Sequence, residues 1–258
     1  MVEWYSKLRD IYCVHDERLA DCISKAYDYS LLHMPLIEDG KLLGLIDFYR
    51  LAGVLSLVKD RLPSLRCRDI LKLTVTHVYV KQYSGFDVLL ATLSRGKYTS
   101  MGVENVEDNG YIGTIMASDI ASVLAGTDYL CNVRVKEVYS RKTGIISTSF
   151  PVTEILKIIA RRRQPCLIVF DGRDVSGILC LSDVLYLLSQ FEVKPPLENM
   201  YAEDFLREPV KISADTRLNE STVLRGFREP LLVLEDNEIS GMLTALDVVD
   251  YVIRRNLY

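Results

Sequence analysis

Residues 230–247 read PLLVLEDNEISGMLTALD, and this stretch sets the pattern for the whole chain. A short apolar run leads to a turn at Asp236 and Asn237, and a second short run ends at Gly241. Short apolar runs separated by Asp or Asn predict a β-hairpin. Two more apolar residues then lead into an amphipathic pattern that predicts a helix. The stretch therefore predicts two strands and a helix in immediate succession.

The same plan occurs four times, and self-similarity of this kind sets the architecture of a chain. The glycine that follows the turn recurs in steps of 69, 64 and 64 residues, as Gly44, Gly113, Gly177 and Gly241. A helical pattern precedes each hairpin; in the third copy, apolar residues between 152 and 159 recur at offsets of three and four. A further short strand precedes that helix. Each copy therefore reads strand, helix, strand, strand, helix, which is an α+β fold.

The four copies are expected to pair, because a unit of about 60 residues buries too little apolar surface to be stable alone. The prediction is two modules of two repeats each. Residues 1–128 form the first pair, with repeats at about 5–60 and 66–127, and residues 129–258 form the second, with repeats at about 133–190 and 200–257. The junction is placed near residues 126–133, where the periodicity is interrupted.

Composition narrows the class of protein. Of the 258 residues, 49% are hydrophobic and 26% are charged, as in ordinary globular proteins. The net charge of −4, without a long block of one sign, argues against general coating of nucleic acid. No run approaches the ~18 apolar residues that span a bilayer, so no membrane association is expected. Residues 1–10 lack the apolar core of a signal peptide, and a cytoplasmic location is expected.

No catalytic or metal-binding motif is found in the sequence. The six cysteines include no C-x-x-C, and the three histidines show no metal-ligand spacing, so no metal site is expected. The cysteines are interpreted mostly as small buried hydrophobic residues. Without a P-loop, a nucleophile elbow or a Gly-rich dinucleotide turn, the chain is not expected to be an enzyme and needs no catalytic cofactor.

The fourth repeat carries a complete motif in Gly241-Met242-Leu243-Thr244-Ala245-Leu246-Asp247: glycine, two apolar residues, a hydroxyl residue, two residues, aspartate. This motif, repeated four times at a near-constant step, resembles the CBS domain. The fourfold arrangement resembles the two Bateman modules of AMP-activated kinase gamma subunits and of archaeal stand-alone relatives. The resemblance implies a disc-like regulatory assembly that binds adenosine-containing ligands in clefts between repeats.

The residue types at the start of the last helix suit a nucleotide. Unpaired N–H groups and the positive end of the helix dipole favour a phosphate there. An aspartate one turn into the helix can accept hydrogen bonds from a ribose diol. The nucleotide-binding pairs predicted in this way are Thr244 with Asp247, Ser182 with Asp183, and Ser118 with Asp119. The first repeat has Asp47 and Arg50 instead, so its cleft is expected to lack nucleotide, or Arg50 contacts the phosphate of a neighbour.

Further candidates follow from the resemblance. The family places basic, phosphate-binding side chains two residues before the strand proline, where this chain has His33, Arg163 and Arg228. Arginine suits phosphate because its guanidinium forms two parallel hydrogen bonds. The family binds the base against the first strand of the partner repeat, which would set Ile145 near Asp247 and Val210 near Asp183.

Purely structural interpretations of these residues remain open. Serine, threonine and aspartate are favoured at helix starts without any ligand. A basic run such as residues 161–163 also complements the negative end of a helix, and His33 suits a structural role.

The leading hypothesis is a non-catalytic regulatory protein that binds AMP, ADP, ATP or a relative such as S-adenosylmethionine between repeats, and relays occupancy to an effector protein that the sequence does not identify. A ligand that bridges two repeats can shift their packing only by the difference between its binding free energies for the two arrangements. A homodimer that completes the assembly is left open. The alternative is a scaffold or a nucleic-acid-associated interaction module with degenerate nucleotide pockets.

Overall fold

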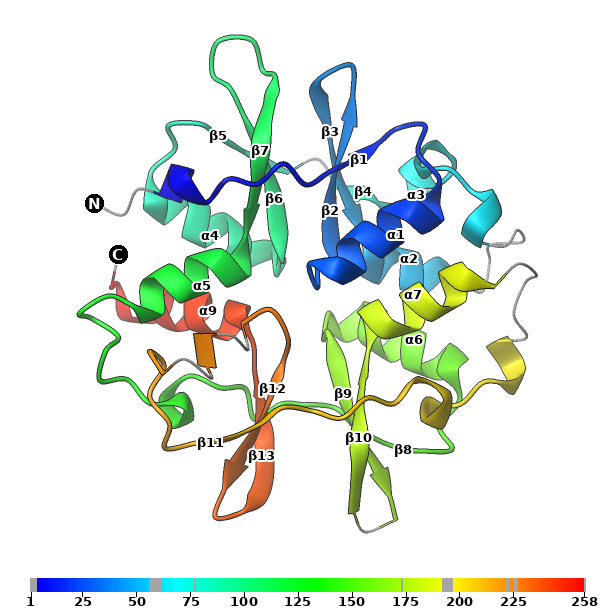
Figure 1. Ribbon diagram of the computed structural model, residues 1–258, viewed down its shortest axis with the longest axis vertical. Coiled ribbons are helices and arrows are strands. Elements are labelled where there is room, and N and C mark those ends of the chain that lie inside the picture. Colours follow the sequence, from blue (N-terminus) through cyan, green and yellow to red (C-terminus); the bar gives the residue numbers. More distant parts are fainter. Residues whose placement is uncertain are drawn as a thin grey trace. The chain divides into compact units, whose positions relative to one another are not determined.

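The computed structural model describes residues 4–55, 62–76, 78–172, 174–191, 197–220, 223–224 and 227–257. The chain divides into two compact units. Unit 1 comprises Met1–Asp10, Tyr79–Thr143 and Pro209–Tyr258, and unit 2 comprises Ile11–Val78 and Gly144–Glu208. Each unit thus combines segments from both halves of the chain: the second and fourth repeats in unit 1, the first and third in unit 2 (Figure 1).

Unit 2 contains two small mixed sheets and the helices that cover them. The first sheet, in the order β1-β2-β3-β4, consists of β1 (Cys13–Val14), β2 (His33–Glu38), β3 (Lys41–Asp47) and β4 (Val75–Thr76). The second, in the order β10-β9-β8, consists of β8 (Ile145–Ser147), β9 (Cys166–Asp171) and β10 (Asp174–Cys180). The helices are α1 (Leu19–Asp28), α2 (Phe48–Val54), α3 (Leu71–Thr74), α6 (Val152–Arg162) and α7 (Leu181–Gln190), with 3₁₀ turns η3 (Leu62–Ser64), η4 (Cys67–Ile70), η6 (Leu197–Asn199) and η7 (Ala202–Phe205).

Unit 1 repeats the arrangement with two three-stranded sheets. One has the order β5-β6-β7, from β5 (Tyr79–Lys81), β6 (Ser100–Glu104) and β7 (Tyr111–Met116). The other has the order β11-β12-β13, from β11 (Lys211–Ser213), β12 (Leu231–Glu235) and β13 (Glu238–Leu243). The helices are α4 (Phe86–Gly96), α5 (Ala117–Ala125) and α9 (Ala245–Arg255), with 3₁₀ turns η1 (Trp4–Lys7) and η5 (Val135–Glu137).

Every repeat pairs its strands in the same way: the first strand is parallel to the second, and the second and third form an antiparallel hairpin. The predicted order of strand, helix, strand, strand, helix is confirmed in the first three repeats. In the fourth, the helix predicted before the hairpin falls partly outside the described residues. The α+β class is confirmed. The division into halves 1–128 and 129–258 stays a prediction, since the two units are defined by contacts and each draws on both halves.

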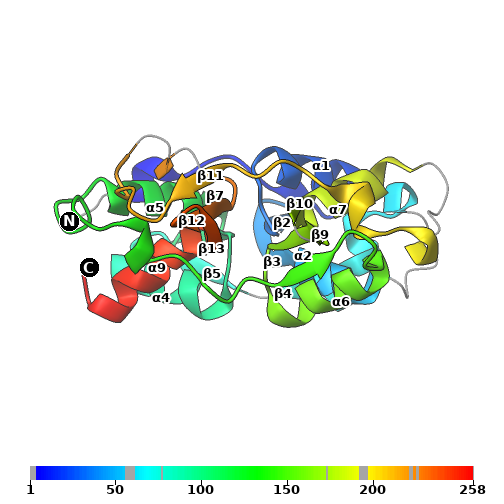
Figure 2. The ribbon, with the colours of Figure 1, turned by 90° about the horizontal axis from the view of Figure 1, so that it is seen from below.

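Helices of two repeats pack together within each unit. In unit 2, α1 packs on α7 and α2 packs on α6; in unit 1, α5 and α4 pack on α9 (Figure 2). The apolar face predicted for α6 is confirmed, because Val152, Ile155, Leu156 and Ile159 are its buried residues. Burial of such faces supplies most of the stabilisation of short helices. None of the helices among the described residues is long and apolar enough to cross a membrane.

The recurring glycine is explained by a second chain segment that crosses the hairpin. Next to Gly177, Ile178 and Arg207 form an isolated bridge with two backbone hydrogen bonds. A Cβ on Gly177 would lie 2.7 Å from the carbonyl oxygen of Arg207. At Gly241 a Cβ would overlap the carbonyl oxygen of Ser140, since that segment crosses at the same place. The third and fourth repeats have glycine here because the crossing backbone leaves no room for a side chain.

Gly241→Ala is expected to lower the free energy of unfolding by about 3 kcal/mol, because either the hairpin or the crossing segment must move. Chemical denaturation measures the effect. Gly126→Ala is the matched control in the same unit: its φ is −82° and a Cβ there meets its nearest atom at 3.5 Å. The control should change stability by less than about 1 kcal/mol. Equal stability of the two variants would contradict this explanation.

Four of the six cysteines are paired in disulfides. Cys13 is bonded to Cys22 in the first repeat, and Cys166 is bonded to Cys180 across the β9–β10 hairpin. The interpretation of the cysteines as mostly small hydrophobic residues was therefore wrong for these four, although they are buried. The pairing depends on which strands and helices come together, which spacing along the chain does not reveal.

Candidate functional site

The three predicted carboxylates, Asp119, Asp183 and Asp247, lie where a hairpin ends and a helix begins, and so does Asp47 of the first repeat. Asp47 is the N-cap of α2, while Asp119, Asp183 and Asp247 lie in the first turns of α5, α7 and α9. Backbone N–H groups at a helix start have no partner within the helix, and the helix dipole there favours negative charge. The placement of Asp119, Asp183 and Asp247 follows from the repeat, whereas Asp47 occupies the position that Thr244 has in the fourth repeat. Each carboxylate has different neighbours.

In unit 1 a pocket brings together predicted residues from two repeats. Its volume is ≈ 460 Å³, and it is lined by Ser118, Asp119, Ser122, Leu224 and Arg228. The carboxylate and the two hydroxyl groups come from α5 of the second repeat, and Arg228 comes from the segment before β12 of the fourth. A pocket of several hundred Å³ that offers an acid, hydroxyls and a cation can hold a small polar ligand.

Arg9 is a further neighbour of Asp119 that the sequence analysis missed. Its guanidinium donates two hydrogen bonds of 2.7 Å, from Nε to Oδ2 and from Nη2 to Oδ1 of Asp119. The backbone of Arg9 is held in turn by two hydrogen bonds to Thr114 of β7. Such a two-pronged pair fixes the orientation of the carboxylate. In this state the carboxylate predicted for a sugar is paired with a cation from the N-terminal segment.

Asp183 in unit 2 has an equivalent partner. Nε of Arg207 lies 3.3 Å from Oδ2 of Asp183, and Nη2 of Arg207 donates to Sγ of Cys180 at 3.2 Å. Arg207 crosses its hairpin beside Gly177. Cys180, which stands three residues before Asp183 as Thr244 does before Asp247, is bonded to Cys166.

The two arginines share a sequence signal that was not used. Leu8-Arg9-Asp10 and Leu206-Arg207-Glu208 have the same pattern of leucine, arginine and acid. Each stands in a segment that crosses the hairpin immediately after the repeated glycine. Comparing the linkers as well as the hairpins would have paired these arginines with the helix-start aspartates.

Asp247 and Thr244 form a capping box, with Asp247 at the third position of α9. Oδ2 of Asp247 accepts hydrogen bonds of 2.7 Å from both the backbone N–H and the hydroxyl of Thr244. This is the structural role that helix starts favour without a ligand. Burial raises the pKa of Asp247 to about 6, although the hydrogen bonds from Thr244 oppose this.

The raised pKa of Asp247 predicts a pH dependence of stability. The folded chain holds this proton up to about pH 6, whereas an unfolded aspartate loses it near pH 4. Because the native state then binds more protons than the unfolded state, the free energy of unfolding should fall as the pH rises from 4 to 6. Asp247→Asn should remove this part of the slope, which chemical denaturation at several pH values measures. A difference in free energy of unfolding between the two proteins that stays constant from pH 4 to pH 6 would contradict the raised pKa of Asp247.

Four side chains of unit 2 form a second cluster, which we call the arginine cluster: His33, Asp47, Tyr49 and Arg163. Nη1 of Arg163 donates to Oδ2 of Asp47 at 2.9 Å, and Nη2 donates to Nε2 of His33 at 2.7 Å. The guanidinium also lies over the ring of Tyr49, with its central carbon 4.9 Å from the ring centroid. Oδ1 of Asp47 accepts from the N–H groups of Tyr49 and Arg50, which caps α2.

Burial keeps His33 in this cluster neutral. Its side chain is fully buried, and the loss of solvation lowers its pKa to about 3, although Asp47 opposes this. Because Arg163 can only donate, Nε2 of His33 is the acceptor and the ring proton resides on Nδ1. Burial likewise raises the pKa of Tyr49. The structure thus joins two predicted phosphate contacts, His33 and Arg163, to the carboxylate of the first repeat.

The two residues predicted to contact the base are exposed. Ile145 is 64% exposed and Val210 is 48% exposed. Ile145 lines a pocket of ≈ 490 Å³ within unit 2, together with Ile146, Phe150, Arg162 and Phe170 among others. The partners predicted for Ile145 and Val210 belong to the other unit in each case, so these two pairings stay predictions.

The fold and the repeated helix-start aspartates define the class of protein. Residues 135–190, from η5 to the end of α7, match the family model of the CBS domain, and the same arrangement recurs along the chain. The chain therefore has the fold of tandem CBS repeats, which is the arrangement that the sequence motifs predicted.

Solved structures extend this likeness over the whole chain. The chain is similar to protein MJ1225 from Methanocaldococcus jannaschii, described as a candidate archaeal homologue of the AMPK gamma subunit, at a TM-score of 0.78 and 14% identity, covering 97% of this chain and 99% of that chain. It is also similar to an uncharacterised conserved protein from Pyrococcus horikoshii, at a TM-score of 0.56 and 17% identity, covering 86% of this chain and 91% of that one. No curated protein matches the chain. At these identities the likeness establishes the fold.

Proposed function

We propose that the protein is a non-catalytic regulator that binds an adenine nucleotide in the unit 1 pocket. The observation that carries the proposal is the meeting of Ser118, Asp119 and Arg228 in one pocket. These residues were assigned to sugar and phosphate from separate repeats, more than 100 positions apart. The likeness to a candidate AMPK gamma homologue over nearly the full chain also supports a regulator that binds an adenine nucleotide.

The chemistry of the pocket suits a phosphorylated nucleoside. Asp119 accepts hydrogen bonds from the ribose diol, and Ser118 and Ser122 offer hydroxyls to the ligand. Arg228 is exposed at the pocket and offers a cation to the phosphate. A volume of ≈ 460 Å³ lies within the range of pockets that hold small molecules.

Arg9 provides a route from occupancy to a partner. Its guanidinium is held by Asp119, so a ligand whose sugar takes this carboxylate displaces or shares the arginine. A phosphate is a suitable second acceptor for the released guanidinium. Because the backbone of Arg9 is tied to β7 through Thr114, such an exchange acts on the N-terminal segment of unit 1. An effector protein or a second copy of the chain would recognise that change.

The other three carboxylates are weaker candidates for the same role. Asp47 is saturated by Arg163 and its own helix, Asp183 is paired with Arg207, and Asp247 caps α9. Asp119 also has an arginine partner, Arg9, but the unit 1 pocket sets it beside Arg228. This pocket is therefore proposed as the first site to fill, with the sites at Asp183 and Asp247 of lower affinity.

Thermal shift and calorimetry with AMP, ADP, ATP and S-adenosylmethionine test the proposal. Ligand at a hundred times its dissociation constant should add about 2.7 kcal/mol to the free energy of unfolding. Mass spectrometry of small molecules released on denaturation identifies a co-purifying ligand. Nucleotide turnover during incubation would contradict the non-catalytic role. No response to any of the four ligands would contradict nucleotide binding and would favour the alternative function given below.

The alternative function is a scaffold or a nucleic-acid-associated module with degenerate pockets. The engagement of Asp47, Asp119 and Asp183 by arginines favours it, because these carboxylates are already paired with cations. It predicts binding to a protein or RNA that is unaffected by Asp183→Ala or Asp247→Ala and is abolished by surface substitutions.

A further inference from the structure

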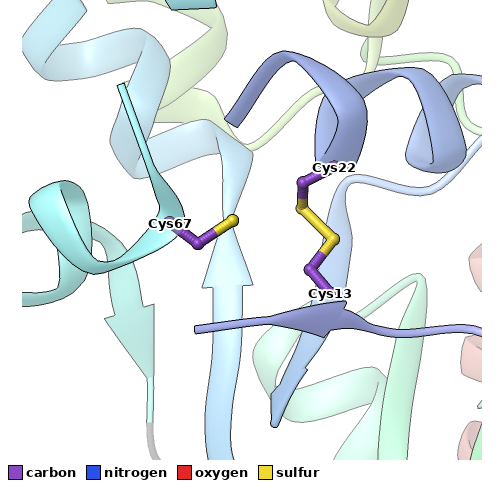
Figure 3. A group of neighbouring side chains, drawn as sticks. All are labelled: Cys13, Cys22 and Cys67. Carbon is purple, nitrogen blue, oxygen red and sulfur yellow. A yellow bond between two sulfur atoms is a disulfide. The ribbon is translucent and has the colours of Figure 1, made fainter. Parts of the chain in front are cut away.

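Three cysteine sulfurs from separate segments meet in unit 2. Cys13 lies on β1, Cys22 lies on α1, and Cys67 is the first residue of η4 (Figure 3). Their Sγ atoms all lie within 4.8 Å of one another. Cys13 and Cys22 are joined by a disulfide, and Cys67 is a free thiol beside it. We call these three residues the cysteine cluster.

The cysteine cluster is buried, and backbone hydrogen bonds hold its segments together. All three side chains are 0% exposed. The N–H of Cys67 donates to the carbonyl of Glu17, and the N–H of Arg68 donates to the carbonyl of His15. These bonds fasten the segment of Cys67 to the turn that joins β1 and α1, the two elements on which Cys13 and Cys22 lie. The approach of the third sulfur is thus fixed by main-chain hydrogen bonds.

The donor set suits one class of metal ion. Thiolate sulfur binds Zn²⁺ at about 2.3 Å, so three sulfurs around one ion lie roughly 4 Å apart. That separation is within the span of the cluster. Soft thiolate ligands select Cu(I) and Zn(II), whereas Mg²⁺ and Ca²⁺ require oxygen ligands. Among the described residues, the group that could hold an ion consists of sulfur donors alone.

We propose that, once the Cys13–Cys22 disulfide is reduced, Cys13, Cys22 and Cys67 bind one thiophilic metal ion, Zn(II) or Cu(I). A dithiol reductant supplies two electrons and two protons to the Cys13–Cys22 bond and becomes a disulfide itself. The metal ion then replaces the three thiol protons, which pass to the solvent. Disulfide and bound metal exclude one another, so the site would report the thiol redox state around the protein.

Metal binding at Cys67 has to displace a thiol proton. Burial raises its pKa to about 12, so at neutral pH it stays a thiol until a cation replaces its proton. Metal binding should therefore strengthen with rising pH, because protons are released. The sequence analysis expected no metal site, since the three cysteines share no short spacing and the fold alone brings them together.

Titration of the full chain tests the proposal. The protein is reduced anaerobically with a dithiol, desalted, and mixed with Zn²⁺, with Cu⁺ or with Mg²⁺. Native mass spectrometry should show one Zn²⁺ or one Cu⁺ per chain and no Mg²⁺, and Co²⁺ in place of Zn²⁺ should give thiolate charge-transfer absorption. Cys67→Ser should weaken Zn²⁺ binding at least about tenfold. The control Cys131→Ser changes the free cysteine outside the cluster and should bind as the unchanged chain does.

Three results would overturn the proposal: a reduced chain that retains neither ion, Zn²⁺ binding that Cys67→Ser leaves unchanged, or a Cys13–Cys22 disulfide that persists under these conditions. Cys67→Ala, which keeps a small apolar side chain at the buried position, replaces Cys67→Ser if the serine variant does not fold. Because the readout is metal binding, the result is independent of nucleotide binding in unit 1.

Discussion

Arg228→Ala is expected to weaken the binding of AMP by about tenfold to a hundredfold. The guanidinium would make charge-assisted hydrogen bonds with the phosphate, each contributing roughly 1.5–3 kcal/mol. A loss of about 1.4 kcal/mol corresponds to a factor of ten in the dissociation constant. Isothermal titration calorimetry measures the change. The fold should be unaffected, because Arg228 is exposed.

Arg217→Ala is the matched control, since this arginine is also exposed and lies in the same repeat but outside the residues that line the pocket. It should bind AMP as the unchanged protein does. Equal affinity of the Arg228 variant, the control and the unchanged protein would contradict the proposed site. Lower affinity in both variants would point to long-range electrostatics rather than to a contact.

The role of Asp119 can be isolated by changing protein and ligand together. Asp119→Ala should weaken AMP binding, and 2′,3′-dideoxy-AMP should bind the unchanged protein more weakly than AMP. If the carboxylate holds the diol, the variant should discriminate little between the two ligands, because the interaction is already missing. Discrimination that persists in the variant would show that another group reads the sugar.

Asp47→Ala is expected to lower the free energy of unfolding of the protein by about 3 kcal/mol. The substitution leaves the Arg163 guanidinium in the arginine cluster without its carboxylate, and removing one partner of a buried pair costs more than the pair contributes. It also removes the oxygen that caps α2. Asp47 is 1% exposed and the Arg163 side chain is 30% exposed, so solvent replaces the lost contact only in part.

Asp21→Ala is the control in the same unit, because its ion pair with Arg18 is exposed and such pairs contribute between zero and about 1 kcal/mol. Urea denaturation compares the two variants. The double variant Asp47→Ala with Arg163→Met should be more stable than Asp47→Ala alone, since the unpaired charge is gone. A loss below about 1 kcal/mol for Asp47→Ala would show that the cluster is not structurally important.

The fold could be predicted because its signals are local and recur. The four hairpin glycines, the turn residues between the strands and the apolar face of α6 all follow from short-range geometry, and the structure places each as expected. Gly177 and Gly241 have a second reason, which is the backbone of the segment that crosses each of their hairpins. That reason involves residues about 30 to more than 100 positions away, and no local pattern contains it.

The candidate site could be predicted only in part. The helix-start aspartates were found, and Thr244 was paired with Asp247, but the arginine partners of the other three were not: Arg9 for Asp119, Arg207 for Asp183 and Arg163 for Asp47. The same motif thus serves as an ion pair, a buried network or a helix cap in different repeats.

Turn chemistry, hydrophobic periodicity and a constant repeat step are properties of neighbouring residues, so the amino-acid sequence was sufficient to establish the repeats, their strand and helix order, and the position of every helix-start carboxylate. The pairing of charges and the meeting of Cys13, Cys22 and Cys67 depend on how distant segments pack. A charged group or a sulfur atom contributes to stability or to ligand binding only through the groups that folding brings within a few ångströms of it. Those contacts were fixed when the repeats folded together.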